Sequence, residues 1–379
     1  MPLPNYEDGS IVNLASSISG AFGSPSSYKP LKALDSESLK GKNIVFVILD
    51  GLGYNCLRRF GKNSFIYRNL KTKATSVFPS DTAACMTSFF SARSVQQHAI
   101  TGWFLPRNRF LTRILNFFPE LNWFLSRLRM VWKGTSNVSL LRIQTAKIYF
   151  VAPSFFVRPW YDLFSIGNPY FVAYDAFSDV VDQVKKIILN GNERKYVAVY
   201  CYKFDDTFHT YGTRSKKGRA VFFEVDKVLK SLSNSISGSN TTMIITADHG
   251  MVDTRKSELV RLTDHHELLD MLEIPPLGNS RVAYFYVRSS MSGQFEQYVR
   301  KKLGKFCTLH RSEDLIKKGY FGLFEPNKEL FYTVGNYTMI MKGNFAIEDL
   351  IHLDPNHRKA HHGALSEDEM YVPVSVIDC

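Results

Sequence analysis

The sequence lacks the marks of several protein classes. Its five cysteines form no Cys-x-x-Cys pair, which excludes a thiolate zinc site and gives no disulfide framework, and this usage is consistent with a reducing compartment. No apolar run reaches the roughly 18 residues that a membrane-spanning helix needs. The first twenty residues carry no secretory signal, because they lack a basic stretch followed by a continuous apolar one. We therefore expect a cytoplasmic protein, or one exported without a recognisable signal, that does not span a membrane.

Repeats and disorder-prone composition are also missing. No motif recurs at a fixed period along the 379 residues. Hydrophobic residues make up 45% of the chain, which is enough to build a large core and excludes wholesale disorder. Basic residues exceed acidic ones by 12, and this excess favours phosphorylated or acidic partners. The sequence contains no nucleic-acid-binding motif, and it does not indicate an oligomeric state.

Three apolar segments have the pattern of buried parallel strands that end in acidic residues. The first, NIVFVILDG, ends at Asp50; the second, KYVAVYCYKFDD, runs into Asp205; the third, TTMIITADHG, ends at Asp248 and His249. Amphipathic segments such as VVDQVKKIIL and AVFFEVDKVLKSLSNSI lie between them and are predicted to be helices. Strands that alternate with helices predict an α/β fold with a mostly parallel sheet and helices on both faces. Ligand sites in such sheets lie beyond the carboxyl ends of the strands.

Two stretches interrupt this pattern, although we expect the whole chain to form a single catalytic domain. The core is predicted at about 41–260 and 351–379, after an irregular lead-in with room for one short helix. Residues 104–160 form a basic, aromatic insertion, and residues 275–350 are predicted to form an inserted α+β cap. The insertion is interpreted either as an amphipathic helix pair on the core or as a lid or membrane-surface segment.

Metal-binding residue types gather at four separate places in the chain. Asp205 and His209 are spaced so that one helical turn puts both on the same face. The other candidates are Asp50, Asp248, His249 and His362. Carboxylates and imidazoles without thiolates suit zinc or manganese. Each residue alone has a plain structural explanation, such as a helix cap or a core histidine. His265 and His266, for example, are predicted to open a helix and to bind nothing.

In chain order these residues resemble the alkaline phosphatase superfamily, and within it the type I phosphodiesterase/nucleotide pyrophosphatase family. The matching stretches are VFVILDGLG, TSVFPSDTAACMTSFFSARSVQQHAITGW, YKFDDTFHTYG, IITADHGM and HHGALSEDEMYVPV. They extend from residue 44 to residue 374, and so cover most of the chain. The resemblance implies an alkaline-phosphatase-like fold and a hydrolase with two divalent metal ions, most simply Zn²⁺, with Mn²⁺ as the alternative.

The resemblance also implies a role for each ligand. One metal would be held by Asp50, Asp248 and His249, and would contact the nucleophile as well. The other would be held by Asp205, His209 and His362. The family pattern favours Asp205 over Asp206 and His362 over His361, although either choice could shift by one residue.

The nucleophile implied by the resemblance is Thr82, within Phe-Pro-Ser-Asp-Thr, with Ser80 as the fallback. A hydroxyl attacks poorly at neutral pH unless a cation lowers its pKa. We predict that Thr82 begins a helix whose positive end favours phosphate, and that it forms a covalent phosphothreonine. The competing interpretation is that Thr82 is only a helix cap.

The substrate is expected to be a small phosphodiester or a nucleotide with a pyrophosphate bond. Eukaryotic family members place an Asn after the His-Gly motif to bind phosphate, and Trp103 stands at that position here. Its indole could donate one hydrogen bond, stack on a base or fill the core. Asp81-Thr82-Ala83-Ala84 also resembles true alkaline phosphatases, so a phosphomonoesterase or phosphate mutase is the first alternative. An inactive protein that binds anionic surfaces through residues 104–160 is the second.

Overall fold

The computed structural model describes residues 1–24, 26–107, 110–113, 145–155, 169–348 and 358–379. Most of the basic, aromatic insertion predicted at 104–160, including its proposed membrane contact, lies outside these residues. What is described there is the short hairpin β3 (Phe104–Arg107) and β4 (Phe110–Arg113), and the strand β5 (Lys147–Pro153). None of the described helices combines the length and the apolar character needed to cross a membrane.

A seven-stranded sheet forms the centre of the molecule. Its strands, in spatial order, are β2 (Leu70–Thr75), β17 (Tyr371–Asp378), β8 (Thr241–Thr246), β1 (Asn43–Leu49), β7 (Lys195–Cys201), β5 and β6 (Tyr170–Tyr174). β8, β1, β7, β5 and β6 are mutually parallel, whereas β17 runs antiparallel to both of its neighbours. The sheet is therefore mostly parallel, as predicted. β1, β7 and β8 are buried almost throughout, because helices cover both of their faces.

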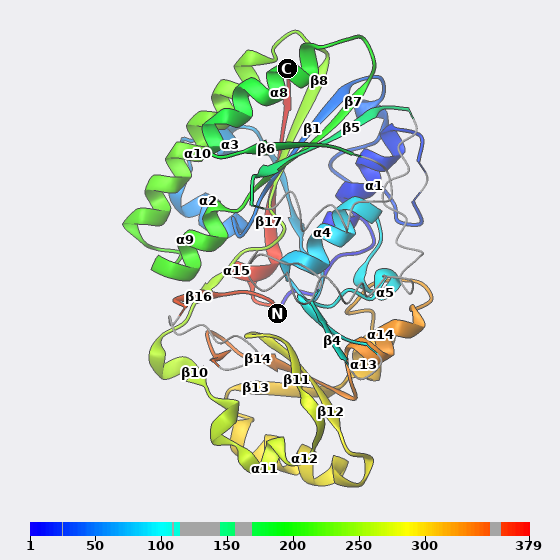
Figure 1. Ribbon diagram of the computed structural model, residues 1–379, viewed down its shortest axis with the longest axis vertical. Helices are drawn as coiled ribbons and strands as arrows, with labels where there is room; N and C mark the ends of the chain where they lie inside the picture. The colour runs from blue at the N-terminus through cyan, green and yellow to red at the C-terminus, as the bar shows by residue number, and fades with distance from the viewer. Residues whose placement is uncertain (25, 108–109, 114–144, 156–168, 349–357) are drawn as a thin grey trace.

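Helices lie on both faces of this sheet (Figure 1). On one face are α2 (Tyr54–Phe60), α3 (Phe65–Arg68), α8 (Val180–Leu189), α9 (Lys203–Tyr211) and α10 (Lys216–Ser235). On the other are α1 (Ile11–Ala21), α4 (Thr82–Ser91) and α5 (Val95–His98). All ten residues of α4 are buried, because α1 packs over it. The lead-in thus contributes a full helix to the core.

A second sheet lies beyond the carboxyl ends of the parallel strands (Figure 1). Its four antiparallel strands are β11 (Leu272–Asn279), β12 (Val282–Val287), β14 (Tyr337–Met341) and β13 (Cys307–Arg311). The helices α11 (His266–Leu269), α12 (Ser292–Tyr298), α13 (Ser312–Lys317) and α14 (Lys328–Thr333) accompany it. This region has its own apolar cluster around Phe285, Phe295 and Met339. We call it the cap.

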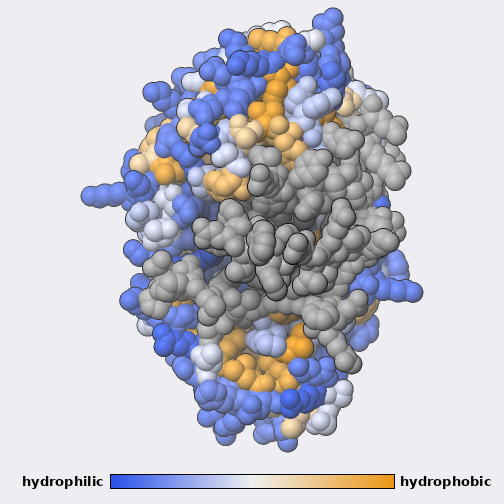
Figure 2. Space-filling view, in the orientation of Figure 1, coloured by the Kyte–Doolittle hydropathy of each residue, from blue (hydrophilic) through white to orange (hydrophobic). Residues whose placement is uncertain are grey.

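Short elements join the two sheets. β10 (Leu259–Val260) pairs with β15 (Ala346–Ile347), β9 (Val252–Asp253) pairs with β16 (Ala360–His361), and α15 (Glu367–Met370) leads into β17. On the coloured part of the face drawn in Figure 2, hydrophilic surface surrounds apolar patches in the upper and lower parts. Exposed apolar side chains include Phe223 on α10 and Tyr332 on α14. β9 follows closely after His249, and β16 directly precedes His362, so the predicted site residues lie near these connecting elements.

Candidate functional site

The carboxyl edge of the central sheet brings the predicted ligands together. Asp50 follows β1, and Asp248 and His249 follow β8, which is hydrogen-bonded to β1. Asp205 lies in the first turn of α9, directly after β7, the other neighbour of β1. His362 reaches the same place from the segment that precedes β17. Five of the six predicted ligands therefore contribute atoms to two compact clusters.

The first cluster consists of Asp50, Asp248 and His249, which we call the inner group. All three side chains are at most 3% exposed. His249 Nε2 lies 3.4 Å from Asp50 Oδ1 and 3.3 Å from Asp248 Oδ2. The other Asp248 oxygen, Oδ1, accepts the backbone N–H groups of Gly51 and His249. The structure therefore groups these residues as the resemblance implied.

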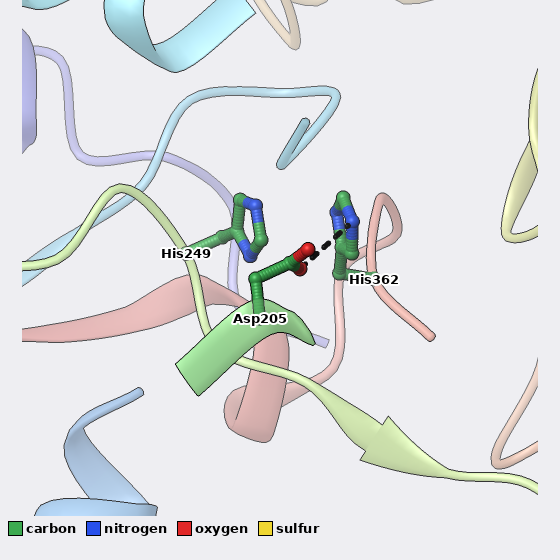
Figure 3. A group of neighbouring side chains, drawn as sticks. All are labelled: Asp205, His249 and His362. Carbon is green, nitrogen blue, oxygen red and sulfur yellow. Dashed lines mark ion pairs between the residues drawn. The ribbon is translucent and has the colours of Figure 1, made fainter. Parts of the chain in front are cut away.

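The second predicted set, Asp205, His209 and His362, is called the outer group. Asp205 Oδ1 lies 3.3 Å from His209 Nε2 and 3.6 Å from His362 Nε2. The compact cluster here joins Asp205 and His362 with His249, whose ring stacks on that of His362 at 3.8 Å. Figure 3 shows the Asp205 carboxylate rising from α9 toward these two rings. His209 stands at the margin, where Arg358 Nη1 approaches its Nε2 to 3.2 Å.

The two compact clusters distinguish Asp205 from its neighbour Asp206, and His362 from its neighbour His361. Asp206, beside Asp205, is exposed and belongs to neither cluster. His361 turns its Nδ1 toward Ser280 Oγ at 2.8 Å, and it also belongs to neither cluster. Asp205 and His362 are therefore better placed than their neighbours to hold a cation.

The histidines are held with Nε2 facing the carboxylates. The Nδ1 atoms of His209, His249 and His362 lie 2.7, 3.1 and 3.0 Å from the carbonyl oxygens of Ala360, Gly250 and Ser80. A carbonyl can only accept, so each Nδ1 carries the proton, and the Nε2 of the neutral ring carries a lone pair. Burial lowers the pKa of His249 to about 4 and that of His362 to about 3, so both rings are neutral at pH 7.

The electron-rich atoms of the site fit a bound cation. Among the described residues, Asp50 Oδ1, Asp205 Oδ1 and Asp248 Oδ2 are buried without a hydrogen-bond partner. Each faces an imidazole lone pair within 3.6 Å, an arrangement that is repulsive unless a positive charge lies between the atoms. Oxygen and imidazole ligands, with the second ring nitrogen bound to a carbonyl, are typical of zinc sites.

Burial and mutual repulsion oppose ionisation of the inner carboxylates. Burial, reinforced by the charges of Asp248 and Asp205, raises the pKa of Asp50 well above its usual value. Burial likewise raises the pKa of Asp248 to about 6. The Asp205 carboxylate lies in the same site, and burial opposes its ionisation as well. A divalent cation would stabilise all three ionised carboxylates.

Thr82 is the first residue of α4, and the cap of that helix is Asp81. Asp81 accepts the N–H of Ala83 at 3.1 Å, so the interpretation of Thr82 as only a cap is wrong. Thr82 Oγ1 lies 3.1 Å from His249 Nε2, and the His249 tautomer makes the hydroxyl the donor. The fallback, Ser80, donates its hydroxyl to the carbonyl of Ala364. Thr82 is thus the hydroxyl that contacts the inner group.

Glycines allow the ligand segments to approach closely. Gly363 follows His362 with a φ of 129°, and a Cβ there would lie 2.2 Å from Asn279 Oδ1. Gly212, with a φ of 89°, ends α9 just after His209. Residues with a Cβ rarely adopt either backbone conformation, so glycine suits both positions.

Two contacting residues were missed by the sequence analysis. Tyr200 on β7 donates its hydroxyl to Asp50 Oδ2, and Asn279 of the cap hairpin donates to Asp81 Oδ2 at 3.3 Å. No local pattern marks either residue, because both contacts join distant parts of the chain. Trp103, the predicted substrate contact, is half-buried and packs against the main core, so its role at the site stays a prediction.

Known proteins resemble this chain in sequence pattern and in fold. The family profile for type I phosphodiesterase/nucleotide pyrophosphatase matches residues 44–364. A search of curated protein sequences found no match. Human ectonucleotide pyrophosphatase/phosphodiesterase 5 has a similar structure, with a TM-score of 0.65, 16% identity, and coverage of 88% of this chain and 87% of that one. An inactive murine form of that protein, in complex with AMP, has a TM-score of 0.63 and 17% identity, and the match covers 88% of this chain and 87% of that one.

Proposed function

Because the chain belongs to the type I phosphodiesterase/nucleotide pyrophosphatase family, we propose that it is a two-metal hydrolase that cleaves phosphodiester or pyrophosphate bonds of small nucleotide-type substrates. The observation that carries the proposal is the convergence of two Asp/His clusters beside the Thr82 hydroxyl at one edge of the sheet. The murine structural neighbour was captured with AMP, which supports a nucleotide as the substrate class.

The inner group, together with Thr82, would hold one divalent ion, and the outer group would hold the other. Zn²⁺ is the expected metal, and Mn²⁺ is the alternative that the same ligands accept. When bound, these ions would lower the pKa of the Thr82 hydroxyl and compensate the charge on the phosphate oxygens. Arg358 would have to leave His209 Nε2 before that nitrogen could act as a ligand.

The residues of the chain orient the attack. Thr82 Oγ1 would give up its proton to water and form a bond to phosphorus while the bond from phosphorus to the leaving alcohol or phosphate oxygen breaks. The result is a phosphothreonine that still carries the other substituent of the substrate on its phosphorus. The N-terminus of α4 carries a partial positive charge that favours the phosphate at this position. Water would then attack the phosphothreonine and regenerate the hydroxyl.

The test compares wild type with Thr82→Ala. Wild type, stripped by chelation and reloaded with Zn²⁺ or Mn²⁺, should hydrolyse bis-p-nitrophenyl phosphate faster than p-nitrophenyl phosphate. Thr82→Ala should lose turnover while its metal content stays near normal, and intact-protein mass spectrometry should detect a phosphoryl adduct only when Thr82 is present. Ser80→Ala is the matched control, because its hydroxyl is bound to Ala364. Normal turnover by Thr82→Ala would remove it as the nucleophile.

Other outcomes would identify the alternatives. Faster cleavage of the monoester would support the phosphomonoesterase interpretation. If the loaded protein cleaves neither ester, nor nucleotide sugars, dinucleotides, NAD or ATP, the proposed hydrolase activity is wrong. Binding to anionic liposomes by such a protein would then favour the surface-binding interpretation.

A further inference from the structure

We propose that Tyr200 is a positioning residue that fixes the Asp50 carboxylate so that one oxygen is presented to a divalent cation. Tyr200 lies near the end of β7, where it is paired with Ile48 of β1, two residues before Asp50. Its side chain is 1% exposed, and its hydroxyl donates a hydrogen bond to Asp50 Oδ2. This inference rests on the proposed metal-binding function.

The two oxygens of Asp50 have different surroundings. Oδ2 accepts the Tyr200 hydroxyl, whereas Oδ1 has no hydrogen-bond partner among the described residues and faces His249 Nε2 at 3.4 Å. The backbone is already fixed, since Asp50 N–H donates to Cys201 and Asp50 C=O accepts from Asp205. The torsion of the carboxylate is the remaining freedom, and the Tyr200 bond sets it.

Tyr200 is itself held in place. The hydroxyl of Tyr174, at the end of β6, donates to the Tyr200 carbonyl at 2.8 Å. A phenol carries its proton at neutral pH, so the Tyr200 hydroxyl donates to the Asp50 carboxylate, which can only accept. Contacts of this kind, which hold a ligand without touching the metal, commonly change metal affinity 10–100-fold when removed.

The same strand provides a matched control. Tyr196 lies four residues before Tyr200, so both side chains project from the same face of β7. It is equally buried, but its hydroxyl has no hydrogen-bond partner among the described residues. Tyr196→Phe therefore removes a buried phenol oxygen from the same sheet without disturbing Asp50.

The experiment measures Zn²⁺ affinity by competition with a chromophoric chelator for wild type, Tyr200→Phe and Tyr196→Phe. We expect Tyr200→Phe to weaken the inner-group affinity by about 10–100-fold and Tyr196→Phe to change it by less than about threefold. Equal affinities of the two variants would overturn the inference. Failure of wild type to bind Zn²⁺ or Mn²⁺ would instead overturn the proposed function.

A double variant tests the route of the effect. If Tyr200 acts through Asp50, Tyr200→Phe should cost little more affinity in an Asp50→Asn background than Asp50→Asn alone. Full additivity would contradict the inference. If Tyr200→Phe is unstable without metal, the release of Zn²⁺ from loaded protein to excess chelator gives the same comparison. Faster release than from Tyr196→Phe supports the inference, and equal rates overturn it.

Discussion

The inner and outer groups differ in what supports them. The inner group sits on loops that leave two hydrogen-bonded central strands, β1 and β8, and its side chains are almost fully buried. In the outer group, Asp205 is 24% exposed and His362 comes from a segment that contacts the cap. The sheet alone can form the first group, whereas the second also depends on the inserted region. The predictions below test this difference, beginning with the largest expected effect.

The cap supports the outer group through a buried ion pair. Arg281, in the β11–β12 hairpin, makes two hydrogen bonds to Glu369, which also accepts the N–H of Ala364, two residues after His362. Arg281→Met should lower the free energy of unfolding by about 3–5 kcal/mol, because it leaves Glu369 buried and unpaired. Urea unfolding of the metal-free protein measures this.

The same variant should also weaken metal binding at the outer group more than at the inner group. Arg311→Met is the control, because its ion pair with Glu296 is largely exposed and should contribute little. An equal loss of metal affinity at both groups would contradict the inference that only the outer group depends on the cap.

Removing one carboxylate from the inner group and one from the outer group should empty different metal sites. Asp248→Ala should lower the metal affinity of the inner group by more than about 100-fold. Losing a ligand should cost more than losing a residue that only supports a ligand, which commonly costs about 10–100-fold. Asp205→Ala should retain one ion per chain at the inner group. Metal content after dialysis measures both, with Asp206→Ala, which alters an exposed carboxyl next to Asp205, as the control. Loss of both ions from Asp205→Ala would show that the groups do not bind separately.

Acid should release the inner ion. Burial raises the pKa of Asp248 to about 6, and a cation must displace the proton that this carboxyl binds below that pH. Affinity at the inner group should therefore fall at least about tenfold per pH unit below pH 6. Zn²⁺ titrations of Asp205→Ala between pH 7.5 and pH 5 isolate this group. A flat profile would contradict the assignment of Asp248 as a ligand.

Asp50→Asn should have opposite effects without and with metal. The folded pKa of Asp50 is raised, so the ionised carboxylate destabilises the metal-free protein increasingly as pH rises above about 4. At pH 7.5 the metal-free variant should therefore have a higher free energy of unfolding than metal-free wild type. The difference in unfolding free energy should vanish near pH 4. In saturating Zn²⁺ the variant should be less stable than wild type, because the metal stabilises wild type more. Thermal unfolding checks each condition, and a loss at pH 7.5 without metal would contradict the predicted repulsion.

The sheet and the inner group could be predicted because their signals are local. Apolar strands that end in Asp50 or in Asp248 and His249 carry both the fold and the ligands in adjacent residues. The predicted helix VVDQVKKIIL is confirmed as α8 with the same bounds. The mostly parallel sheet and the alkaline-phosphatase-like fold are confirmed as well.

The remainder depends on contacts that the sequence does not mark. Asn279 and Asp81 are 198 residues apart, and β7 is buried on both faces, so no alternation distinguishes Tyr200 from its neighbours. The serine-rich lead-in resembles a loop, but its small side chains allow α1 to pack closely.

The position of β17 has a consequence for how the molecule matures. This strand follows every other strand in chain order, yet it lies between β2 and β8 in the interior of the sheet. During synthesis, β2 and β8 leave the ribosome with a gap between them, and long-range pairings of this kind form slowly. The segment that leads into β17 also delivers His362. A nascent chain therefore cannot complete the outer group before this segment has been synthesised and β17 has entered the sheet.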